Sequence, residues 1–542
     1  MEWGSVVKDF VMEQEHRGRI ARAAGVVSGA TLLSRILGFV RDLIIARAFG
    51  AGTATDAFFA AFRLPNMLRE LLGEGALSAA FIPVFTESFR TRGRESAWRL
   101  AWTVLTMLML LLLAVSSVGI VFAPWLIRLI APGFHAIPSK LDLAVYLTRM
   151  MFPYILFIGV AALFMAILNS QGHFATPALS PSVLNIAMIA CALYLTPYVD
   201  PPIAALAIGV LIGGVGQLVM QIPAIWRRSR GVQWGIDVAD PAVGRITRLM
   251  TPGIAGLAIT QVNVFIGTLL ASLMGEGGIS ILYYAFRLIQ LPIGLFGVAI
   301  ATAAFPTMAK QAANRSLGEV AATVAYAIRL VLFVTLPSMV GLIVFRVQII
   351  QLLFERGAFD RTVTLATAEV VLFYAFGLGA YVSNRILVPA FYSLQDTATP
   401  VKIGMVAVVV NIVSSLLLMR PLGLGGLALA TALSSFVNLG LLLIALQKRL
   451  GRLNGLRVRS LAQIAGPAAL MALIALSLVH FFDPLTIEPA LRRAAVLAFE
   501  LATSLVAFLV AAACLGSEEI KGLLRWLISR RRTIEGAPSG ED

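Results

Sequence analysis

Apolar runs of about twenty residues recur from one end of the 542-residue chain to the other, and the polar stretches between them are mostly short connectors. A helix rises about 1.5 Å per residue, so a run of this length crosses the ~30 Å hydrocarbon core of a bilayer. Hydrophobic residues make up 59% of the chain and charged residues 13%, which leaves no stretch for a soluble catalytic domain. The sequence therefore predicts an all-α polytopic membrane protein.

Fourteen transmembrane helices are predicted from these runs. They lie at residues 24–49, 57–86, 101–123, 143–168, 177–198, 202–226, 249–274, 279–308, 321–345, 364–393, 400–419, 424–446, 460–482 and 494–516. Two cysteines, Cys191 and Cys514, fall inside apolar runs, where they are typical packing residues. Neither a disulfide nor a metal site is predicted, and no cofactor is expected.

Lysine and arginine are distributed unevenly over the connectors. Alternate connectors, including residues 90–99, 227–248 and 448–459, are rich in basic residues, mainly arginine, whereas the connectors on the opposite side hold few. Because positive charge is retained in the cytoplasm and an even number of spans returns the chain to the same side, both termini are predicted to be cytoplasmic. This topology, together with anionic lipid headgroups, accounts for the net charge of +15 and argues against a nucleic-acid partner.

Three short matches recur at nearly constant spacing. The sequence AFRL at 61–64 returns at 285–288, and Gly133 of IRLIAPGF corresponds to Gly357 of IQLLFERGAF, both at an offset of 224 residues. The sequence ATP at 175–177 returns at 398–400, at an offset of 223 residues. Such matches in order predict a tandem repeat, and an offset that covers an even number of helices gives two lobes related by a pseudo-two-fold along the membrane normal.

The repeat divides the chain into six predicted segments. These are a cytoplasmic amphipathic segment (1–23), an N-lobe of six spans (24–226), a cytoplasmic interlobe linker (227–248), a C-lobe of six spans (249–447), two C-terminal spans (448–516) and a cytoplasmic basic tail (517–542). A two-lobed membrane protein holds its site between the lobes and exposes it to each side in turn. The organisation therefore indicates transport.

Charged side chains interrupt the predicted spans. Nine arginines lie within them: Arg35, Arg41, Arg47, Arg63, Arg69, Arg149, Arg287, Arg329 and Arg385. A helix that enters from the cytoplasm near residue 22 reaches roughly 20 Å by Arg35, too deep for snorkelling. Arg47, Arg149 and Arg329 are interpreted as structural, because they lie close enough to a span end or a cavity wall to snorkel. A charge at mid-bilayer costs about 3 to more than 10 kcal/mol, so the deeper groups are expected to face water, acids or an anionic ligand. The deeper groups are Arg35, Arg41, Arg69 and Arg287.

Alternatively, these arginines could form purely structural ion pairs with nearby acids. Seven-residue spacing places Arg35 with Asp42, and Arg63 with Glu70, on common helix faces. The first two spans and the eighth nevertheless carry more arginines than acids. Guanidinium groups bind phosphate oxygens in a bidentate manner and keep their charge when desolvated. The excess therefore predicts a cationic cavity for a phosphorylated or pyrophosphorylated substrate.

Six stretches are specific enough to suggest a family. They are SRILGFVRD (34–42), ATDAFFAAFRLPNMLRELLGEGALSAAFIPVF (54–85), APGF (131–134), FPYILF (152–157), YYAFRLIQLPIGLFGVAIATAAFP (283–306) and PAFYSLQDTATPVKI (389–403). Together they closely resemble the MurJ (MviN) lipid II flippases of the multidrug/oligosaccharidyl-lipid/polysaccharide exporter superfamily. The resemblance implies a bacterial inner-membrane flippase that moves lipid-linked peptidoglycan precursor to the periplasmic leaflet without covalent chemistry.

The resemblance also implies site residues. Its substrate-binding positions correspond to Arg35, Arg41, Asp42, Asp56, Arg69, Glu74 and Arg287, with Arg63, Glu70, Phe286 and Gln290 supporting the cavity. The arginines would hold the pyrophosphate and sugars of lipid II, and a groove beside the last two spans would hold its polyprenyl tail. Some relatives have acids where this chain has Phe286 and Gln290, so ion coupling through those positions is not implied.

Other functions remain to be separated from this one. A drug exporter or a flippase for another lipid-linked oligosaccharide shares the superfamily, although a cation exporter needs an acidic cavity. A transferase or phosphatase needs clustered acids or a nucleophile with a base, and this chain has only scattered acids and four separate histidines. Membrane potential or a monovalent ion is the expected driving force, and membrane lipids and cell-wall synthesis enzymes are the expected further partners.

Overall fold

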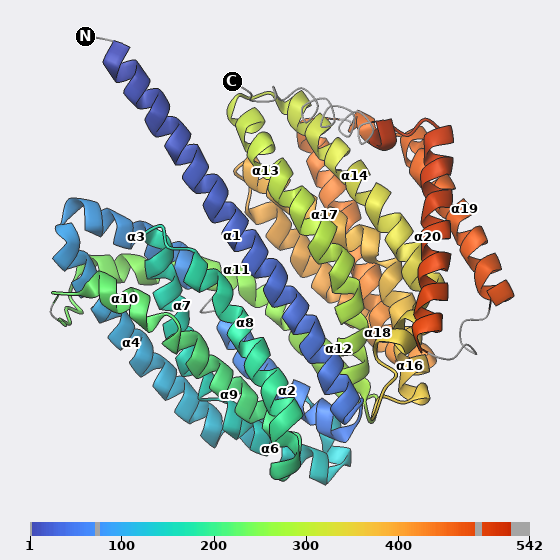
Figure 1. Ribbon diagram of the computed structural model, residues 1–542, viewed down its shortest axis with the longest axis horizontal. Coiled ribbons are helices and arrows are strands. Elements are labelled where there is room, and N and C mark those ends of the chain that lie inside the picture. The colour runs from blue at the N-terminus through green and yellow to red at the C-terminus, as the bar shows by residue number, and fades with distance from the viewer. Residues whose placement is uncertain (1–2, 71–75, 233, 452, 483–489, 522–542) are drawn as a thin grey trace, which may run out of the picture. The chain divides into compact units, whose positions relative to one another are not determined.

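A computed structural model describes residues 3–70, 76–232, 234–451, 453–482 and 490–521, and over these ranges the regular structure is helical, without strands (Figure 1). The chain divides into two compact units. The first comprises Met1–Ser280 and Arg356–Phe359, and the second comprises Ile281–Glu355 and Asp360–Asp542. The seventh predicted span thus packs in the first unit, and the predicted division into six-span lobes stays a prediction.

The described residues of the first unit form eleven α-helices, α1 to α11. They are α1 (Trp3–Phe49), α2 (Thr53–Arg69), α3 (Leu77–Thr91), α4 (Gly93–Val121), α5 (Ala123–Ile130), α6 (Pro138–Met151), α7 (Tyr154–Ser170), α8 (Ala175–Ala190), α9 (Ala204–Val219), α10 (Ile222–Ser229) and α11 (Pro241–Ser272). A short 3₁₀-helix, η2 (Pro132–Ala136), follows α5, and η3 (Cys191–Leu195) and η4 (Thr196–Tyr198) extend α8.

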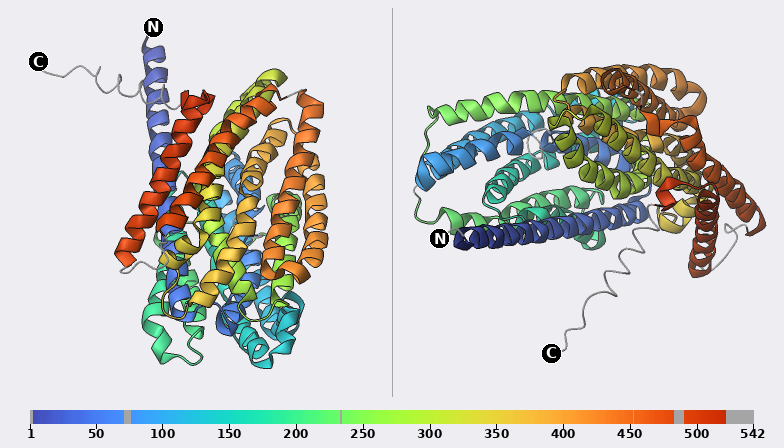
Figure 2. Two further views of the ribbon diagram at one scale, coloured as in Figure 1. Left: turned by 90° about the vertical axis from the view of Figure 1, so that its right-hand side faces the viewer. Right: turned by 90° about the horizontal axis from the view of Figure 1, so that it is seen from above.

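The second unit begins inside α12 (Gly278–Pro292), which continues through the π-helical turn η5 (Ile293–Gly297) into α13 (Val298–Ala313). The remaining helices are α14 (Leu317–Val344), α15 (Arg346–Leu353), α16 (Arg361–Phe376), α17 (Leu378–Ser393), α18 (Ala398–Leu450), α19 (Val458–Phe482) and α20 (Ala490–Cys514), with the 3₁₀-helix η6 (Asn454–Leu456) before α19. Helices α19 and α20 lie side by side as a hairpin (Figure 2).

The helices agree with the predicted spans. Within the described ranges, nine helical stretches are long and apolar enough to cross a membrane, and α16 with α17 forms a tenth that bends by 44°. One of the nine, α18, contains two predicted spans, because Gly423 has φ 54° and breaks the helix after Pro421. The predicted spans at 24–49, 57–86 and 249–274 lie in α1, α2 with α3, and α11. Helices α2 and α3 have 17 and 15 residues, so neither alone has the length of a span. The count of fourteen is therefore compatible with the fold.

The structure reproduces the internal repeat element by element. At the offset of 224 residues, α4, α5 and α6 of the first copy correspond to α14, α15 and α16 of the second, and α7 and α8 correspond to α17 and the start of α18. Even the local irregularity recurs, since Glu70 and Ala76 have π-helical backbone and η5 is the corresponding π-helical turn. The two eight-residue helices α5 and α15 were not among the predicted elements.

Two glycines make reciprocal contacts with the first helix of the opposite repeat. Gly133, after α5, packs its Cα against the backbone carbonyl of Ser272 at the end of α11, and its N–H donates to Ser272 Oγ at 3.1 Å. Gly357, after α15, packs in the same way against the carbonyl of Arg47 near the end of α1, and the N–H of Ala358 donates to that carbonyl at 2.9 Å. The matched glycines of the sequence repeat thus have one structural role.

Replacement of Gly357 by alanine is expected to destabilise the protein. Gly357 has φ +61°, and a Cβ would overlap the carbonyl oxygen of Arg47. Strain of this kind costs about 1 to 3 kcal/mol, which should lower the melting temperature in detergent. Gly404→Ala in α18 is the matched control, because no atom lies within 4 Å of the position that its Cβ would take and alanine favours a helix. Equal melting temperatures for the two variants would contradict the interpretation.

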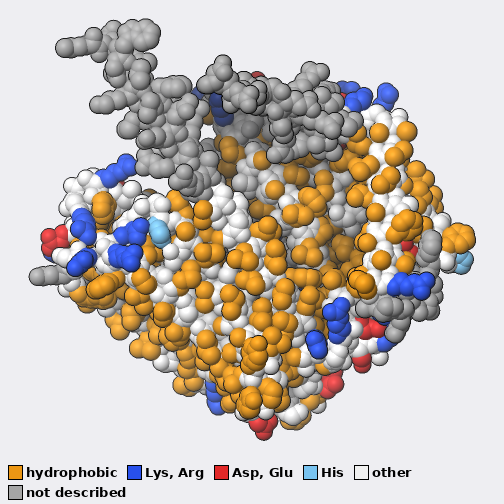
Figure 3. All heavy atoms as spheres, in the orientation of Figure 1, with side chains coloured by type: hydrophobic (Ala, Val, Ile, Leu, Met, Phe, Trp, Pro, Cys, Tyr) orange, Lys and Arg blue, Asp and Glu red, His pale blue; other side chains and the backbone are white. Residues whose placement is uncertain are grey.

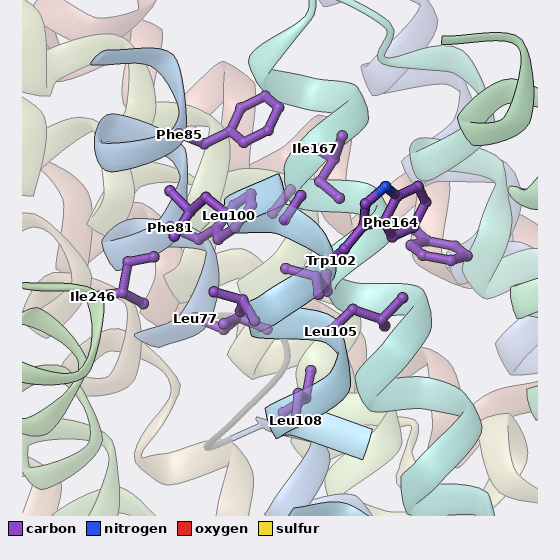
Figure 4. Packing of buried hydrophobic residues seen from close by; sticks show 14 of the residues in the cluster. Leu77, Phe81, Phe85, Leu100, Trp102, Leu105, Leu108, Phe164, Ile167 and Ile246 are labelled. Atoms are coloured by element: carbon purple, nitrogen blue, oxygen red, sulfur yellow. The ribbon is translucent and has the colours of Figure 1, made fainter. Parts of the chain in front are cut away.

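A large apolar cluster forms the interior of the first unit. Side chains of α3, α4, α7 and α11 meet in it, including Phe81, Trp98, Leu105, Ile167 and Ile246 (Figure 4). Trp102 of α4 stacks on Trp234 with ring centroids 4.6 Å apart, which fastens the connector before α11 to the cluster. Helix α11 packs against α3, and α2 lies beside α11.

Outward-facing side chains on the long helices are largely apolar. On the face seen in Figure 3, hydrophobic side chains cover the middle of the helices, and lysine, arginine and acidic side chains gather toward the margins. Exposed examples include Leu110, Val121, Leu417, Leu473 and Val510. A lipid environment, not water, suits this surface.

Candidate functional site

Arg41 on α1 is clamped between its neighbour and α8. Its Nε and Nη2 donate to Asp42 Oδ1 at 3.0 and 2.7 Å, and its Nη1 donates to Asn185 Oδ1 at 3.1 Å. Asn185 in turn donates to the backbone carbonyl of Ser34 at 3.1 Å. Arg41 is 9% exposed and Asp42 is 0% exposed, so the pair is desolvated and neutral as a unit. Through Asn185, the Arg41–Asp42 pair therefore joins α1 to α8, and these two helices pack along each other (Figure 1).

Arg35 lies nearly two turns before Arg41 on α1 and is exposed. In the described part of the chain it makes no ion pair with Asp42, although their spacing placed them on a common face. Asp42 is already committed to Arg41. Arg35 therefore presents its guanidinium to the surroundings of α1.

The polar face of α2 packs against α11. Arg63 donates from Nε to Thr268 Oγ1 at 3.2 Å. Among the described residues, the arginine within ion-pair distance of Glu70 is Arg69, not Arg63 as the spacing suggested. Glu70 accepts from Asn66 Nδ2 at 2.8 Å and from Gln261 Nε2 at 2.6 Å. These amides hold the carboxylate of Glu70 in place at the end of α2.

Arg69 is partly buried beside Glu70. Its Nη2 lies 4.0 Å from Glu70 Oε1, and its Nε donates to Asn66 Oδ1 at 3.1 Å. It also lines a cavity of about 30 Å³ among α7, α8 and α9. The Oε1 atoms of Gln217 and Gln221, which also line it, have no hydrogen-bond partner within the described ranges. A cavity of this size holds about one water molecule. Arg69 thus lines the same small cavity as the side-chain amides of Gln217 and Gln221.

Asp56 is in a buried ion pair. Its carboxylate accepts from Lys140 Nζ at 2.7 Å, and from the backbone N–H and hydroxyl of Ser280 at 2.8 and 2.6 Å. The Ser280 N–H belongs to the first turn of α12, whose donors have no partner within the helix and favour negative charge. Lys140 also lies 4.6 Å from the ring centroid of Phe134. Asp56 and Lys140 are both about 1% exposed as side chains, so Asp56 joins α2, α6 and α12.

The remaining predicted residues lie elsewhere. Arg287 on α12 is in the second unit, where its Nη1 donates to Gln290 Oε1 at 3.1 Å and its guanidinium lies 5.9 Å from the ring centroid of Tyr283. Phe286 packs on Tyr374, with ring centroids 5.3 Å apart. Glu74 lies outside the described residues. The structure thus joins Arg41 with Asp42 and Arg69 with Glu70, whereas Asp56 is held apart with Lys140.

Several partners were not predicted from the sequence. Asn185 accepts from Arg41, and Thr268 accepts from Arg63. Gln261 donates to Glu70, and both Lys140 and Ser280 donate to Asp56. Lys140 had one available signal, since it is among the few basic residues of the outer connectors. The other four are single polar residues in apolar runs or connectors, without a distinguishing pattern.

An apolar pocket of about 400 Å³ lies on the first unit. Side chains of α4, α7, α9 and α10 line it, including Trp102, Phe157, Leu218 and Trp226. Its lining suits a hydrocarbon chain. The tail groove predicted beside α19 and α20 stays a prediction.

Comparison with known proteins identifies the family. Residues 45–491 match the family described as "Lipid II flippase MurJ". The chain belongs to this family. It is 37% identical over 433 residues to a Vibrio cholerae protein named "Probable lipid II flippase MurJ", covering 78% of this chain and 82% of that protein. A Rhizobium tropici protein of the same name is 34% identical over 516 residues, covering 93% and 96% of the two chains.

Solved structures agree with the MurJ assignment. One described as "Lipid II flippase MurJ, inward closed conformation" has a TM-score of 0.74 and 26% identity, covering 92% of this chain and 99% of that one. An inward-facing multidrug resistance transporter of the MATE family has a TM-score of 0.64 at 14% identity, which shows the fold alone. These findings confirm the polytopic all-α fold and place the chain in a family of transporters, not enzymes.

Proposed function

We propose that this protein translocates lipid II from the cytoplasmic to the periplasmic leaflet of the bacterial inner membrane, with both termini cytoplasmic. The observation that carries the proposal is the match to the MurJ lipid II flippase family over residues 45–491. It is supported by the arginines inside membrane-spanning helices, because guanidinium groups suit a pyrophosphate. We further propose alternating access, in which a cationic central cavity opens to each side in turn.

The contacts of the predicted residues suggest two kinds of role. Arg35 is exposed and Arg69 and Arg287 are partly exposed, so we assign them to direct contact with the pyrophosphate and sugars. Arg41 is already neutralised by Asp42, and Asp56 by Lys140, so we assign these pairs to positioning α1, α2 and α12. Glu70 supports Arg69, and Arg63 fixes α2 on α11.

Membrane potential is the driving force that this arrangement favours. The potential is negative inside, and moving one negative charge outward gains about 2.3 kcal/mol per 100 mV. A lipid with a pyrophosphate carries more than one such charge at neutral pH. Translocation is therefore expected to need no chemical fuel.

The test is translocation of fluorescent lipid II in vesicles that contain the purified protein and a potassium diffusion potential. An inside-negative potential in cytoplasm-like orientation should raise the rate, and Arg287→Ala should lower it at least about tenfold, since one charge-assisted contact is worth about 1.5 to 3 kcal/mol. Arg149→Ala is the matched control, because Arg149 is exposed and, among the described residues, its side chain donates to the Ile120 carbonyl alone, at 3.3 Å. It should retain the wild-type rate.

Two results would contradict the proposal. A rate that is indifferent to potential would remove the driving force. Translocation of another lipid-linked oligosaccharide, or of a cationic drug, without translocation of lipid II would assign the protein to a different branch of the exporter superfamily.

A further inference from the structure

A single carboxyl group lies in the middle of α20. Glu500 is ten residues into the helix that begins at Ala490, which is about 15 Å along its axis and deep in a membrane span. Its exposed fraction is 0%. The proposed flippase mechanism does not use this residue.

The carboxyl group of Glu500 has no partner in the described residues. Neither Oε1 nor Oε2 makes a hydrogen bond, and Ser504, one turn further along the same face, has an unpartnered hydroxyl and is also 0% exposed. Leu497, on the same face one turn before, packs with Phe345 and Ala475 in an apolar cluster that Val479 and Leu501 border. The surroundings of Glu500 are therefore apolar and closed.

No cation on the neighbouring helices pairs with Glu500 in the part of the chain that the structure describes. The helices packed on α20 are α14, α15 and α19. Arg329 of α14 is bound to Glu518 and Glu519 at 2.8 and 2.7 Å, and Arg346 of α15 donates to the Ile343 carbonyl.

The other titratable groups on these helices lie near helix ends. Glu319 is in the first turn of α14, and Tyr326 lies further along α14 but is exposed. Arg459 and His480 are near the two ends of α19 and exposed. Arg492 and Arg493 are in the first turn of α20, and Cys514 is its last residue. Buried side-chain oxygens without partners lie on α14 (Thr335) and α15 (Gln348 and Gln351). Over their described residues, the helices around α20 thus provide no ion-pair partner for Glu500.

An ionised carboxylate is not stable in such a place. Removing a carboxylate from water without a partner costs several kcal/mol at least, and the group takes up a proton instead. A protonated carboxyl is neutral, and its hydroxyl becomes a donor for oxygen acceptors. Glutamic acid, unlike glutamate, therefore fits the closed space on α20.

We propose that Glu500 is a proton-binding site in the α19–α20 hairpin (Figure 2). It carries a proton in the conformation described here and releases it when water reaches this face of α20. Release leaves a negative charge that would drive the hairpin to remain open until a proton returns. The inference rests on the burial and contacts of Glu500, and it is independent of which lipid the protein moves.

Labelling with dicyclohexylcarbodiimide tests the protonation state, because this apolar reagent reacts with protonated carboxyl groups. The full-length protein in detergent micelles is treated at pH 8, and its peptides are analysed by mass spectrometry. We expect an adduct on Glu500 and none on Glu95, because the carboxylate of Glu95 is exposed to water and lies 3.5 Å from Arg99. Glu500→Gln should lose the adduct. An unlabelled Glu500 in the wild-type protein would overturn the proposal, and protection by Na⁺ at constant pH would replace the proton by a sodium ion.

Thermal unfolding of Glu500→Gln gives an independent test. If the group is already neutral, an amide of the same size should leave the melting temperature within about 2 °C of the wild-type value. If it is ionised and held by a cation outside the described residues, the amide should lower the melting temperature by much more, which would contradict the proposal. Lipid II translocation is measured separately, so that failure of the flippase function does not decide the outcome for Glu500.

Discussion

Replacement of Arg41 by alanine is expected to lower both stability and lipid translocation more than any other single change on α1. The substitution leaves the fully buried carboxylate of Asp42 without its cation and breaks the hydrogen bond to Asn185. Removing one partner of a buried ion pair costs about 3 to 5 kcal/mol. Thermal unfolding in detergent and translocation of fluorescent lipid II in vesicles should both show the loss.

A double variant separates positioning from substrate contact. Arg41→Ala with Asp42→Asn removes both charges, so most of the stability should return, because a neutral pair avoids the cost of an unpaired buried charge. If Arg41 acts by holding α1 on α8, translocation should recover in part along with the stability. A stable but inactive double variant would contradict this and assign Arg41 to the pyrophosphate. Asn185→Ala, which leaves the ion pair intact and removes a neutral partner of Arg41, should cost less, about 1.5 to 3 kcal/mol.

The spans and the repeat could be predicted because they depend on local sequence. Hydropathy over about twenty residues locates helices of bilayer length. The two predicted spans at 400–419 and 424–446 both lie in α18, on either side of the kink at Gly423. The short helices α5 and α15 were missed because eight residues are fewer than such a window requires. The repeat was visible in three matches, and Gly133 and Gly357 show why two of those positions agree, since each admits a carbonyl group that a side chain would displace.

The partners of the charged residues could not be predicted in the same way. The position of Arg41 or Asp56 along its helix gives the depth of the residue in the membrane. The direction in which the side chain points, and the neighbouring helix that supplies its partner, depend on tertiary packing. Asn185 is 144 residues from Arg41, and Gln261 is 191 residues from Glu70. Spacing within one helix suggested Arg63 with Glu70, whereas α11 supplies a partner to each of them.

Replacement of Lys140 by methionine should have the second large effect. Lys140 is 1% exposed, and its ammonium group is the only cation within ion-pair distance of Asp56 among the described residues. Methionine fills a similar volume but leaves Asp56 with the two donors of Ser280 alone, at a cost of about 3 to 5 kcal/mol. The melting temperature in detergent should fall by several degrees, and translocation should fall with it, because α2, α6 and α12 lose their common anchor.

The double variant Lys140→Met with Asp56→Asn is the matched control. An amide at position 56 can still accept from the Ser280 N–H and hydroxyl through its oxygen, so the start of α12 keeps its cap while the unpaired charge disappears. A double-mutant cycle should then give a coupling energy of at least about 1 kcal/mol between the two residues, as expected for groups in direct contact. Additive losses would show that the ion pair contributes nothing, and that Asp56 acts through Ser280 alone. A double variant that is stable yet does not move lipid II would show that the charge of Asp56 itself takes part in translocation, as the family resemblance implies. The ion pair with Lys140 would then be one state of Asp56 in the transport cycle, and not its whole role.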